Sequence, residues 1–269
     1  MPQAYTAAHF SKAAALTRMS DAPALNSFST DMRVVVAGAS GGIGSAMVEL
    51  LAASSRVAQI FALTRSQPSP SHHKVESITF DLQVEASIAA AAERCKADGP
   101  LDLVFVATGV LHAGESLAPE KSWRALNAQS LAHSFAVNAI GPALIAKHFL
   151  DLLRPGEKSV FAALSARVGS VEDNRLGGWH SYRASKAALH MLMRTCAIEL
   201  ARRNPSALCI ALHPGTVDTA LSQPFQANVP EGKLFTPVYS AERLLQVIDS
   251  LDASASGSAF AWDGNKIPF

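Results

Sequence analysis

Short apolar segments that alternate with helical patterns constrain the fold of this chain more than any other feature. Residues 33–37 form a continuous β-branched run typical of a strand buried on both faces. Similar runs occupy residues 59–64, 77–82, 101–106, 159–164, 208–212 and 258–262, and helical patterns occupy residues 45–53, 85–97, 131–153, 182–203 and 241–251. Parallel strands joined by helical crossovers predict an α/β fold. We expect a single doubly wound parallel sheet with helices on both faces, whose ligands bind beyond the carboxyl ends of the strands.

Composition fits one well-packed domain and excludes several classes of function. Of 269 residues, 49% are apolar and 17% charged, and we expect residues 32–269 to form the domain, with a substrate loop at 216–237. The net charge of +1, from 23 basic and 22 acidic residues, argues against a nucleic-acid or membrane partner. Three cysteines without a CxxC motif suggest a reducing, cytoplasmic location, and the absence of HExxH leaves a metal site unsupported.

Residues 1–31 lack the features of the predicted domain. They are rich in Ala and Ser and aperiodic, with no uninterrupted apolar stretch of the kind that a secretory signal contains. We expect a disordered or poorly packed extension. A transit peptide, or a start codon placed upstream of Met32, remains an alternative.

A glycine-rich segment follows the first predicted strand directly. Residues 38–44 read Gly-Ala-Ser-Gly-Gly-Ile-Gly and lead into the helical pattern that begins at Ser45. Glycines let the backbone approach a ligand, and the free N–H groups and dipole of a helix N-terminus attract an anion. The segment therefore predicts a cradle for dinucleotide phosphates, rather than only a tight turn, although its spacing is GxxxGxG and not GxGxxG.

The same residues match the GxSxG pattern of a hydrolase, with Ser40 in the position of the nucleophile. In that fold several strands precede the nucleophile, whereas only the strand at 33–37 precedes Ser40. The hydrolase is therefore the less favoured alternative.

The end of the second predicted strand bears on which dinucleotide binds. Thr64 and Arg65 stand where NAD enzymes of this architecture place an acidic residue for the ribose 2′-hydroxyl. A guanidinium beside hydroxyl groups suits a 2′-phosphate instead, so we expect NADP, with NAD as the less favoured cofactor. An arginine that simply ends a strand in solvent is the alternative.

The helical pattern at residues 131–153 is apolar on nearly all sides, so a core or a partner subunit must cover it. We therefore expect a homo-oligomer, either a dimer or a tetramer. Within this pattern Asn138 is a lone amide, and Pro142 four residues later has no N–H to bond its carbonyl. We expect a kink whose free carbonyl provides a water site; a merely kinked core helix is the alternative.

Residues suited to acid–base chemistry follow the fifth predicted strand. Ser165 comes directly after it, at the edge where ligands bind, although a serine there is also a common turn former. Tyr182 and Lys186 lie four residues apart and therefore share one helical face. A nearby ammonium lowers the pKa of a tyrosine from near 10, which predicts a tuned acid/base. The plainer alternative is an aromatic ring stacked beside a surface lysine.

These features occur together in one family. Over residues 33–269 the chain resembles the short-chain dehydrogenases/reductases, on Gly38-x-x-x-Gly42-Ile43-Gly44, Asn138, Ser165, Tyr182-x-x-x-Lys186 and Pro214-Gly215, in family order. Each element is weak alone, but the ordered set is specific. The resemblance implies a Rossmann-type fold and hydride transfer between NADP(H) and a small carbonyl or alcohol substrate.

The resemblance also implies roles for individual residues. Asn138, Ser165, Tyr182 and Lys186 match a catalytic tetrad, in which Tyr182 is the general acid/base, Ser165 binds the reacting oxygen, Lys186 holds the ribose and Asn138 orders a water. Adenine contacts are implied at Asp81 and Leu82, and nicotinamide and phosphate contacts across residues 214–219. The predicted cofactor-binding residues are Gly38, Ser40, Gly42, Ile43, Gly44, Thr64, Arg65, Asp81, Leu82, Ala107, Thr108, Gly109, Tyr182, Lys186, Pro214, Gly215, Val217 and Thr219.

Three further stretches, residues 177–186, 228–237 and 262–264, resemble the C-factor subgroup of that family. Its members are linked to cell–cell signalling or resemble carbonyl reductases. A signalling or nucleotide-sensing protein with little turnover is therefore the alternative function. Ala37 replaces a usual Thr, and residues 106–109 replace an Asn-Asn-Ala-Gly turn, which affects the support of the cofactor pocket more than the chemistry.

Overall fold

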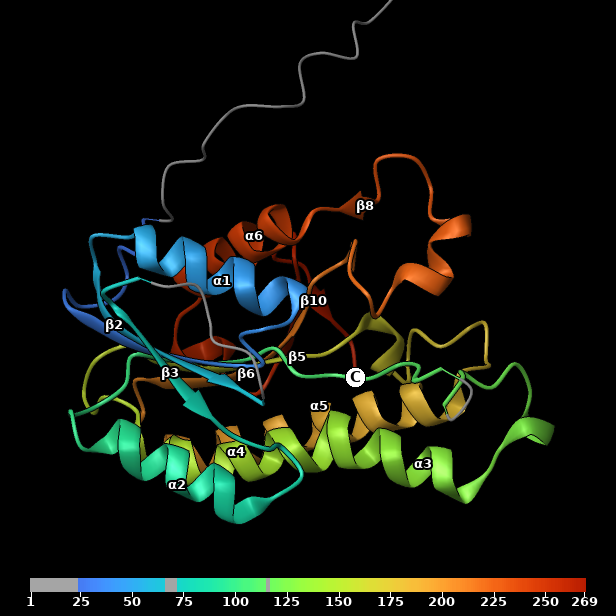
Figure 1. Ribbon diagram of the computed structural model, residues 1–269, viewed down its shortest axis with the longest axis horizontal. Helices are drawn as coiled ribbons and strands as arrows, with labels where there is room; N and C mark the ends of the chain where they lie inside the picture. Colours follow the sequence, from blue (N-terminus) through green and yellow to red (C-terminus); the bar gives the residue numbers. More distant parts are fainter. Residues whose placement is uncertain (1–23, 66–71, 115–116) are drawn as a thin grey trace, which may run out of the picture.

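An eight-stranded sheet forms the centre of the molecule in the computed structural model, which describes residues 24–65, 72–114 and 117–269 (Figure 1). Its strands are β1 (Met32–Ala37), β2 (Val57–Thr64), β3 (Val75–Thr79), β4 (Leu103–Val106), β5 (Ser159–Leu164), β6 (Ala207–His213), β9 (Ala259–Ala261) and β10 (Lys266–Ile267). They lie in the order β10-β9-β6-β5-β4-β1-β2-β3, and only the β9–β10 pair is antiparallel. The predicted doubly wound α/β fold is confirmed.

Helices cover both faces of the sheet (Figure 1). On one face lie α1 (Gly42–Ala53) and α6 (Pro237–Ser250); on the other lie α2 (Glu85–Lys96), α4 (Gly141–Phe149) and α5 (His180–Ala201), with α3 (Ala128–Phe135) extending that layer. The alternation along β1 explains the two cores, because Val34 and Val36 pack with the α1–α6 layer and Val35 with the opposite layer. All six residues of β1 are buried, as its continuous apolar sequence predicts.

Two boundaries differ from the sequence-based expectation. Strand β3 ends at Thr79, so Asp81 and Leu82 follow the strand instead of belonging to it. Leu25 and Phe28, which we assigned to a poorly packed extension, are buried in the core beside α6. Residues 1–23 of that predicted extension lie outside the described residues.

The long apolar pattern at 131–153 is divided by a π-helical turn. Helix α3 passes into this turn at Ala136–Ile140, where the Gly141 N–H bonds the carbonyl of Ala136, and then into α4. Because Pro142 has no N–H, the regular i→i+4 ladder cannot continue through this point. The expected irregularity beside Asn138 is therefore a π turn.

The strand order reverses between β1 and β4, which places the ligand crevice of such a sheet at their carboxyl ends. Ala37 and Val106 are paired at those ends, so the segments that follow them begin side by side. A two-stranded ladder, β7 (Thr216–Val217) with β8 (Leu234–Phe235), joins the two ends of the substrate loop nearby.

Candidate active site

A cavity of about 810 Å³ lies at the carboxyl ends of the central strands and is bordered by residues that follow β1, β4, β5 and β6. The predicted site residues that line it are Gly42, Ile43, Arg65, Ala107, Thr108, Gly109, Ser165, Tyr182, Lys186, Pro214, Gly215, Val217 and Thr219. The predicted site residues outside its lining are Gly38, Ser40, Gly44, Thr64, Asp81, Leu82 and Asn138. One cavity therefore brings together segments that are distant in the sequence.

The glycine segment adopts a turn that larger residues would obstruct. Gly38 has φ +84, and a Cβ on Gly44 would lie 2.1 Å from the Gly38 carbonyl oxygen. A Cβ on Gly42 would lie 2.7 Å from the methyl group of Thr219. Helix α1 begins here with no side-chain cap and no acidic residue in its first turn. These features fit the phosphates of a dinucleotide.

Arg65, directly after β2, lines the cavity and is exposed. Thr64 beside it is buried. The Asp81 carboxylate accepts the Gln83 N–H at 2.9 Å, and the Leu82 side chain packs against Gly141. Their implied adenine contacts stay a prediction.

The turn after β4 carries a polar atom without a partner. Thr108 lines the cavity, and its Oγ1 is buried with no hydrogen-bond partner among the described residues. A Cβ on Gly109 would lie 3.7 Å from Lys186 Nζ, so this turn passes close to the predicted catalytic residues.

Tyr182 and Lys186 occupy the first turns of α5 and are both buried. The Lys186 ammonium lies 5.9 Å from the centre of the Tyr182 ring and donates to the Leu164 carbonyl at 2.9 Å. Burial raises the pKa of Tyr182 to about 12 and lowers the pKa of Lys186 to about 7. Our prediction of a lowered tyrosine pKa is therefore wrong here, because desolvation alone accounts for the shift of the Tyr182 pKa.

Ser165 follows β5 and is only 5% exposed, with its Oγ 2.8 Å from Nε2 of His190. Asn138 lies behind these residues in the π turn. Its Oδ1 accepts the Val110 N–H at 2.8 Å, and its Nδ2 donates to the Val110 carbonyl and to Ser185 Oγ. The amide thus fixes the segment after β4 to α5.

The apolar residues that form one wall of the cavity were not singled out in the sequence, although two of them lie in the predicted substrate loop at 216–237. Leu111, Val168, Trp179, Leu221 and Phe225 form a cluster around Tyr182. The Trp179 and Phe225 rings lie 5.1 Å apart between centroids. These residues come from several loops, and no local periodicity identifies them. Trp179 belongs to residues 177–186, which were noted only for their resemblance to the C-factor subgroup.

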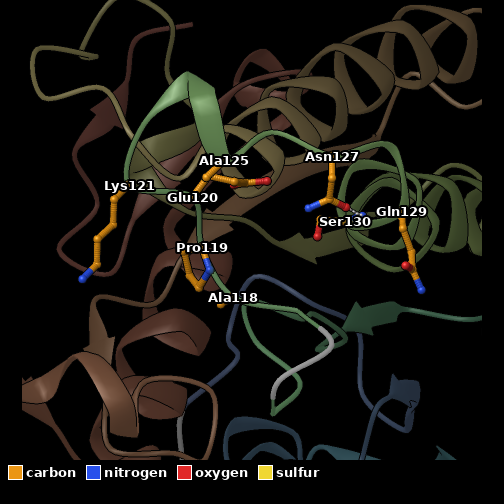
Figure 2. Close-up of a pocket in the computed structure, with 8 residues that line it drawn as sticks. All are labelled: Ala118, Pro119, Glu120, Lys121, Ala125, Asn127, Gln129 and Ser130. Carbon is orange, nitrogen blue, oxygen red and sulfur yellow. Dashed lines mark hydrogen bonds between the residues drawn. The ribbon is translucent and has the colours of Figure 1, made fainter.

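A second cavity, of about 680 Å³, lies at the segment that precedes α3 (Figure 2). It is lined by Ala118, Pro119, Glu120, Lys121, Ala125, Asn127, Gln129 and Ser130. Asn127 Oδ1 caps α3 through the Ser130 N–H. The Glu120 carboxylate accepts hydrogen bonds from the N–H and hydroxyl of Ser181. The side chains of Asn127 and Glu120 therefore already make structural hydrogen bonds.

Comparison with known proteins identifies the family. Residues 32–230 match the short chain dehydrogenase family. The chain belongs to this family. A 1-hydroxy-2-glutathionyl-2-methyl-3-butene dehydrogenase of Rhodococcus sp. is 32% identical over 185 residues, covering 68% of this chain and 76% of that protein. The C-signal of Myxococcus xanthus is 32% identical over 174 residues, covering 64% of this chain and 94% of that protein.

The fold also matches a solved structure. The NADPH-bound carbonyl reductase from chicken fatty liver superimposes with a TM-score of 0.77 at 24% identity, covering 90% of this chain and 96% of that one. The predicted family, its likeness to C-factor proteins and carbonyl reductases, and an NAD(P)-dependent oxidoreductase assignment are confirmed. The hydrolase alternative is wrong. Within the part of the chain that the structure describes, no acidic, His or Cys cluster suits a metal ion, and no helix could span a membrane.

Proposed function

We propose that the chain transfers a hydride between NADP(H) and an apolar carbonyl or secondary alcohol. The main support for this proposal is that Ser165, Tyr182 and Lys186 line the same cavity as the glycine segment. The exposed Arg65 guanidinium supports NADP rather than NAD, because it offers paired donors to a 2′-phosphate.

The glycine segment and Arg65 would hold NADPH, which in the direction of reduction would supply the hydride for the carbonyl carbon and be oxidised to NADP⁺. Tyr182 gives its phenolic proton to the carbonyl oxygen, and its pKa of about 12 keeps that proton in place at neutral pH. Ser165 donates a hydrogen bond to the same oxygen as charge develops there. Lys186, when protonated, stabilises the resulting phenolate and holds the ribose. Asn138 fixes the segment after β4 and orders the water that returns the proton.

The substrate end of the cavity is apolar. Leu111, Val168, Leu221 and the contacting rings of Trp179 and Phe225 form it, and no carboxylate is among the cavity-lining residues that the structure describes. Arg167 also lines the cavity, but it pairs with Asp173 at 3.1 Å. An uncharged substrate with a flat apolar group beside the carbonyl fits such walls.

The test is NADPH oxidation with benzaldehyde, 4-carboxybenzaldehyde and a short aliphatic aldehyde. We expect turnover with benzaldehyde, a lower kcat/KM for the carboxylated analogue, and loss of turnover in Tyr182→Phe. Tyr239 lies on α6 and is 39% exposed, so Tyr239→Phe is the matched control. Turnover that survives Tyr182→Phe contradicts the mechanism, and a preference for the carboxylated aldehyde contradicts the substrate class.

The likeness to the C-signal favours one second candidate, a signalling or nucleotide-sensing protein with little turnover. Tight NADPH binding in titration calorimetry, together with no turnover on any aldehyde or ketone, would favour this candidate over the enzyme.

We also propose a homo-oligomer in a cytoplasmic compartment. Support comes from the exposed apolar side chains of Ile140, Met191 and Ile198, which are 52%, 66% and 47% exposed, and from three free cysteines. Sedimentation at micromolar concentration should show a dimer or tetramer; a monomer would contradict this proposal.

A further inference from the structure

His190 contacts the predicted catalytic serine directly. Its Nε2 lies 2.8 Å from Ser165 Oγ, and the two residues are 3% and 5% exposed. His190 lies one turn beyond Lys186 and two turns beyond Tyr182, so one face of α5 carries all three side chains. The histidine therefore forms the wall behind Ser165, away from the cavity lining.

The surroundings keep this imidazole neutral and fixed in place. Burial, with the charge of Lys186 one turn away, lowers the pKa of His190 to about 4. The ring of Phe269 lies edge-on at 6.0 Å between centroids. A neutral imidazole carries one N–H, and its second ring nitrogen can only accept a hydrogen bond.

The two possible tautomers have opposite consequences for Ser165. If Nδ1 carries the proton, Nε2 accepts the serine hydroxyl, and Ser165 offers only lone pairs to the cavity. The Nδ1 atom has no hydrogen-bond partner among the described residues, so this tautomer also buries an N–H without an acceptor. Buried N–H groups without acceptors are rare in proteins, as the backbone shows, whereas acceptors with unused capacity are better tolerated.

We propose that His190 is a positioning residue whose Nε2–H donates to Ser165 Oγ, which frees the serine hydroxyl to donate to the reacting oxygen in the cavity. The proposal rests on the hydride transfer proposed above. Ser165 then accepts from behind and donates forward, so its hydroxyl hydrogen has one favoured direction. A serine without this donor could turn its hydrogen toward other acceptors and would stabilise the developing charge less well.

Nitrogen-15 NMR tests the tautomer without relying on activity. Two-bond ¹H–¹⁵N correlations of the full-length labelled protein at pH 7, with His190 assigned from the His190→Asn spectrum, should show a protonated Nε2 and an unprotonated Nδ1. A protonated Nδ1, or an imidazolium, would overturn the proposal. The tautomer can be measured even if the protein turns over no substrate. A wrong tautomer assignment is therefore distinguishable from failure of the proposed function.

Kinetics test the consequence. His190→Leu should lower kcat for benzaldehyde toward that of Ser165→Ala, a loss of roughly 100-fold, and leave the KM for NADPH unchanged. His190→Asn retains an N–H donor and should recover much of the rate. The double variant with Ser165→Ala should be no slower than Ser165→Ala alone, because both changes remove one interaction.

The exposed His133 on α3 supplies the matched control, and His133→Leu should leave kcat unchanged. Additive losses in the double variant would contradict the proposal. Equal losses in His190→Leu and His190→Asn, together with lower thermal stability in both, would show a purely structural histidine and overturn it.

Discussion

Arg65 is the residue on which the choice of cofactor depends. Its guanidinium is exposed at the end of β2 and has no carboxylate partner among the ion pairs of the described residues. Arg65→Ala should raise the Kd for NADPH roughly tenfold to 100-fold, because it removes charge-assisted hydrogen bonds to the 2′-phosphate. Binding of NADH should be almost unchanged. Calorimetric titration with both nucleotides measures this. Arg124→Ala, which is exposed and outside the cavity lining, is the control; equal losses for NADPH and NADH would refute the assignment.

Two histidines, the buried His190 and the half-buried His213, make the stability of the domain depend on pH. Burial lowers the pKa of both His190 and His213 to about 4, from 6.5. As the pH falls from 6.5 to 4, the unfolded chain takes up protons that the folded protein does not, so stability is full above pH 6.5 and declines through this interval. Each histidine contributes about 3 kcal/mol to the decline. Guanidine unfolding midpoints between pH 7.5 and 4 should fall less steeply in His190→Asn and in His213→Asn. A profile unchanged from the wild type in both variants would contradict this.

Some residues of the site were predictable from the sequence and others were not. Glycines after a buried strand, and a Tyr and Lys four residues apart, have local spacings that chemistry explains. His190 could have been found, since it continues the spacing of Tyr182 and Lys186 by one more turn. Phe225 carries no such signal, because its place beside Trp179 depends on how two loops fold toward each other. The raised pKa of Tyr182 also depends on burial, which spacing does not reveal.

At the scale of single elements, α5 depends on a residue from another part of the chain. Its N-cap, Trp179, has φ +51 and gives no side-chain hydrogen bond. Glu120 takes over this role, accepting the Ser181 N–H at 3.1 Å and the Ser181 hydroxyl. Tyr182 is the next residue, so the carboxylate fixes the turn from which the proposed acid projects.

Glu120→Ala should therefore destabilise the domain by about 1–2 kcal/mol and also lower kcat, because Tyr182 loses its fixed helical turn. Glu120→Gln retains an acceptor oxygen and should lose less of both. Thermal unfolding and benzaldehyde kinetics measure the two effects. Glu157→Ala, at an exposed position between α4 and β5, is the control. Normal kcat in a destabilised Glu120→Ala would show that the cap does not position Tyr182.

The helix that we predicted over residues 131–153 was predictable in its position but not in its local geometry. Asn138 and Pro142 correctly indicated an irregularity, since an amide in an apolar helix and a missing N–H both disturb it. The π geometry itself was not predicted, nor were the tertiary contacts beside it: Asn138 bonds Val110, and Gly141 receives the side chain of Leu82. Neither contact has a sequence signature.

At the scale of the whole molecule, one buried carboxylate stabilises the amino ends of the central strands, opposite the cavity. Asp102 is fully buried and accepts the Arg33 N–H at 2.8 Å. Arg154 adds two bonds, at 2.5 and 3.0 Å. The contacts join the start of β1, the start of β4 and the segment that leads into β5.

Asp102→Ala leaves Arg154 without its partner and should cost about 3–5 kcal/mol of folding free energy. Guanidine unfolding monitored by tryptophan fluorescence measures the loss. The exposed pair of Asp151 and Arg203 supplies the control, and Asp151→Ala should leave the midpoint nearly unchanged. A loss in Asp102→Ala no larger than in Asp151→Ala would show that the buried pair does not stabilise the sheet.

The ladder between β7 and β8 has a consequence for engineering this scaffold. It closes the substrate loop at its base, where Gly215 has φ +81 and a Cβ would meet the Phe235 ring at 2.6 Å. The two strands thus hold the ends of the loop together, while Ala220 and Phe225 within it contact His112 and Trp179. Residues 220–233 can be exchanged together, with the stem, Thr219 and the proton-transfer residues kept, and a library of such loops would sample new substrates while the predicted cofactor contacts stay unchanged.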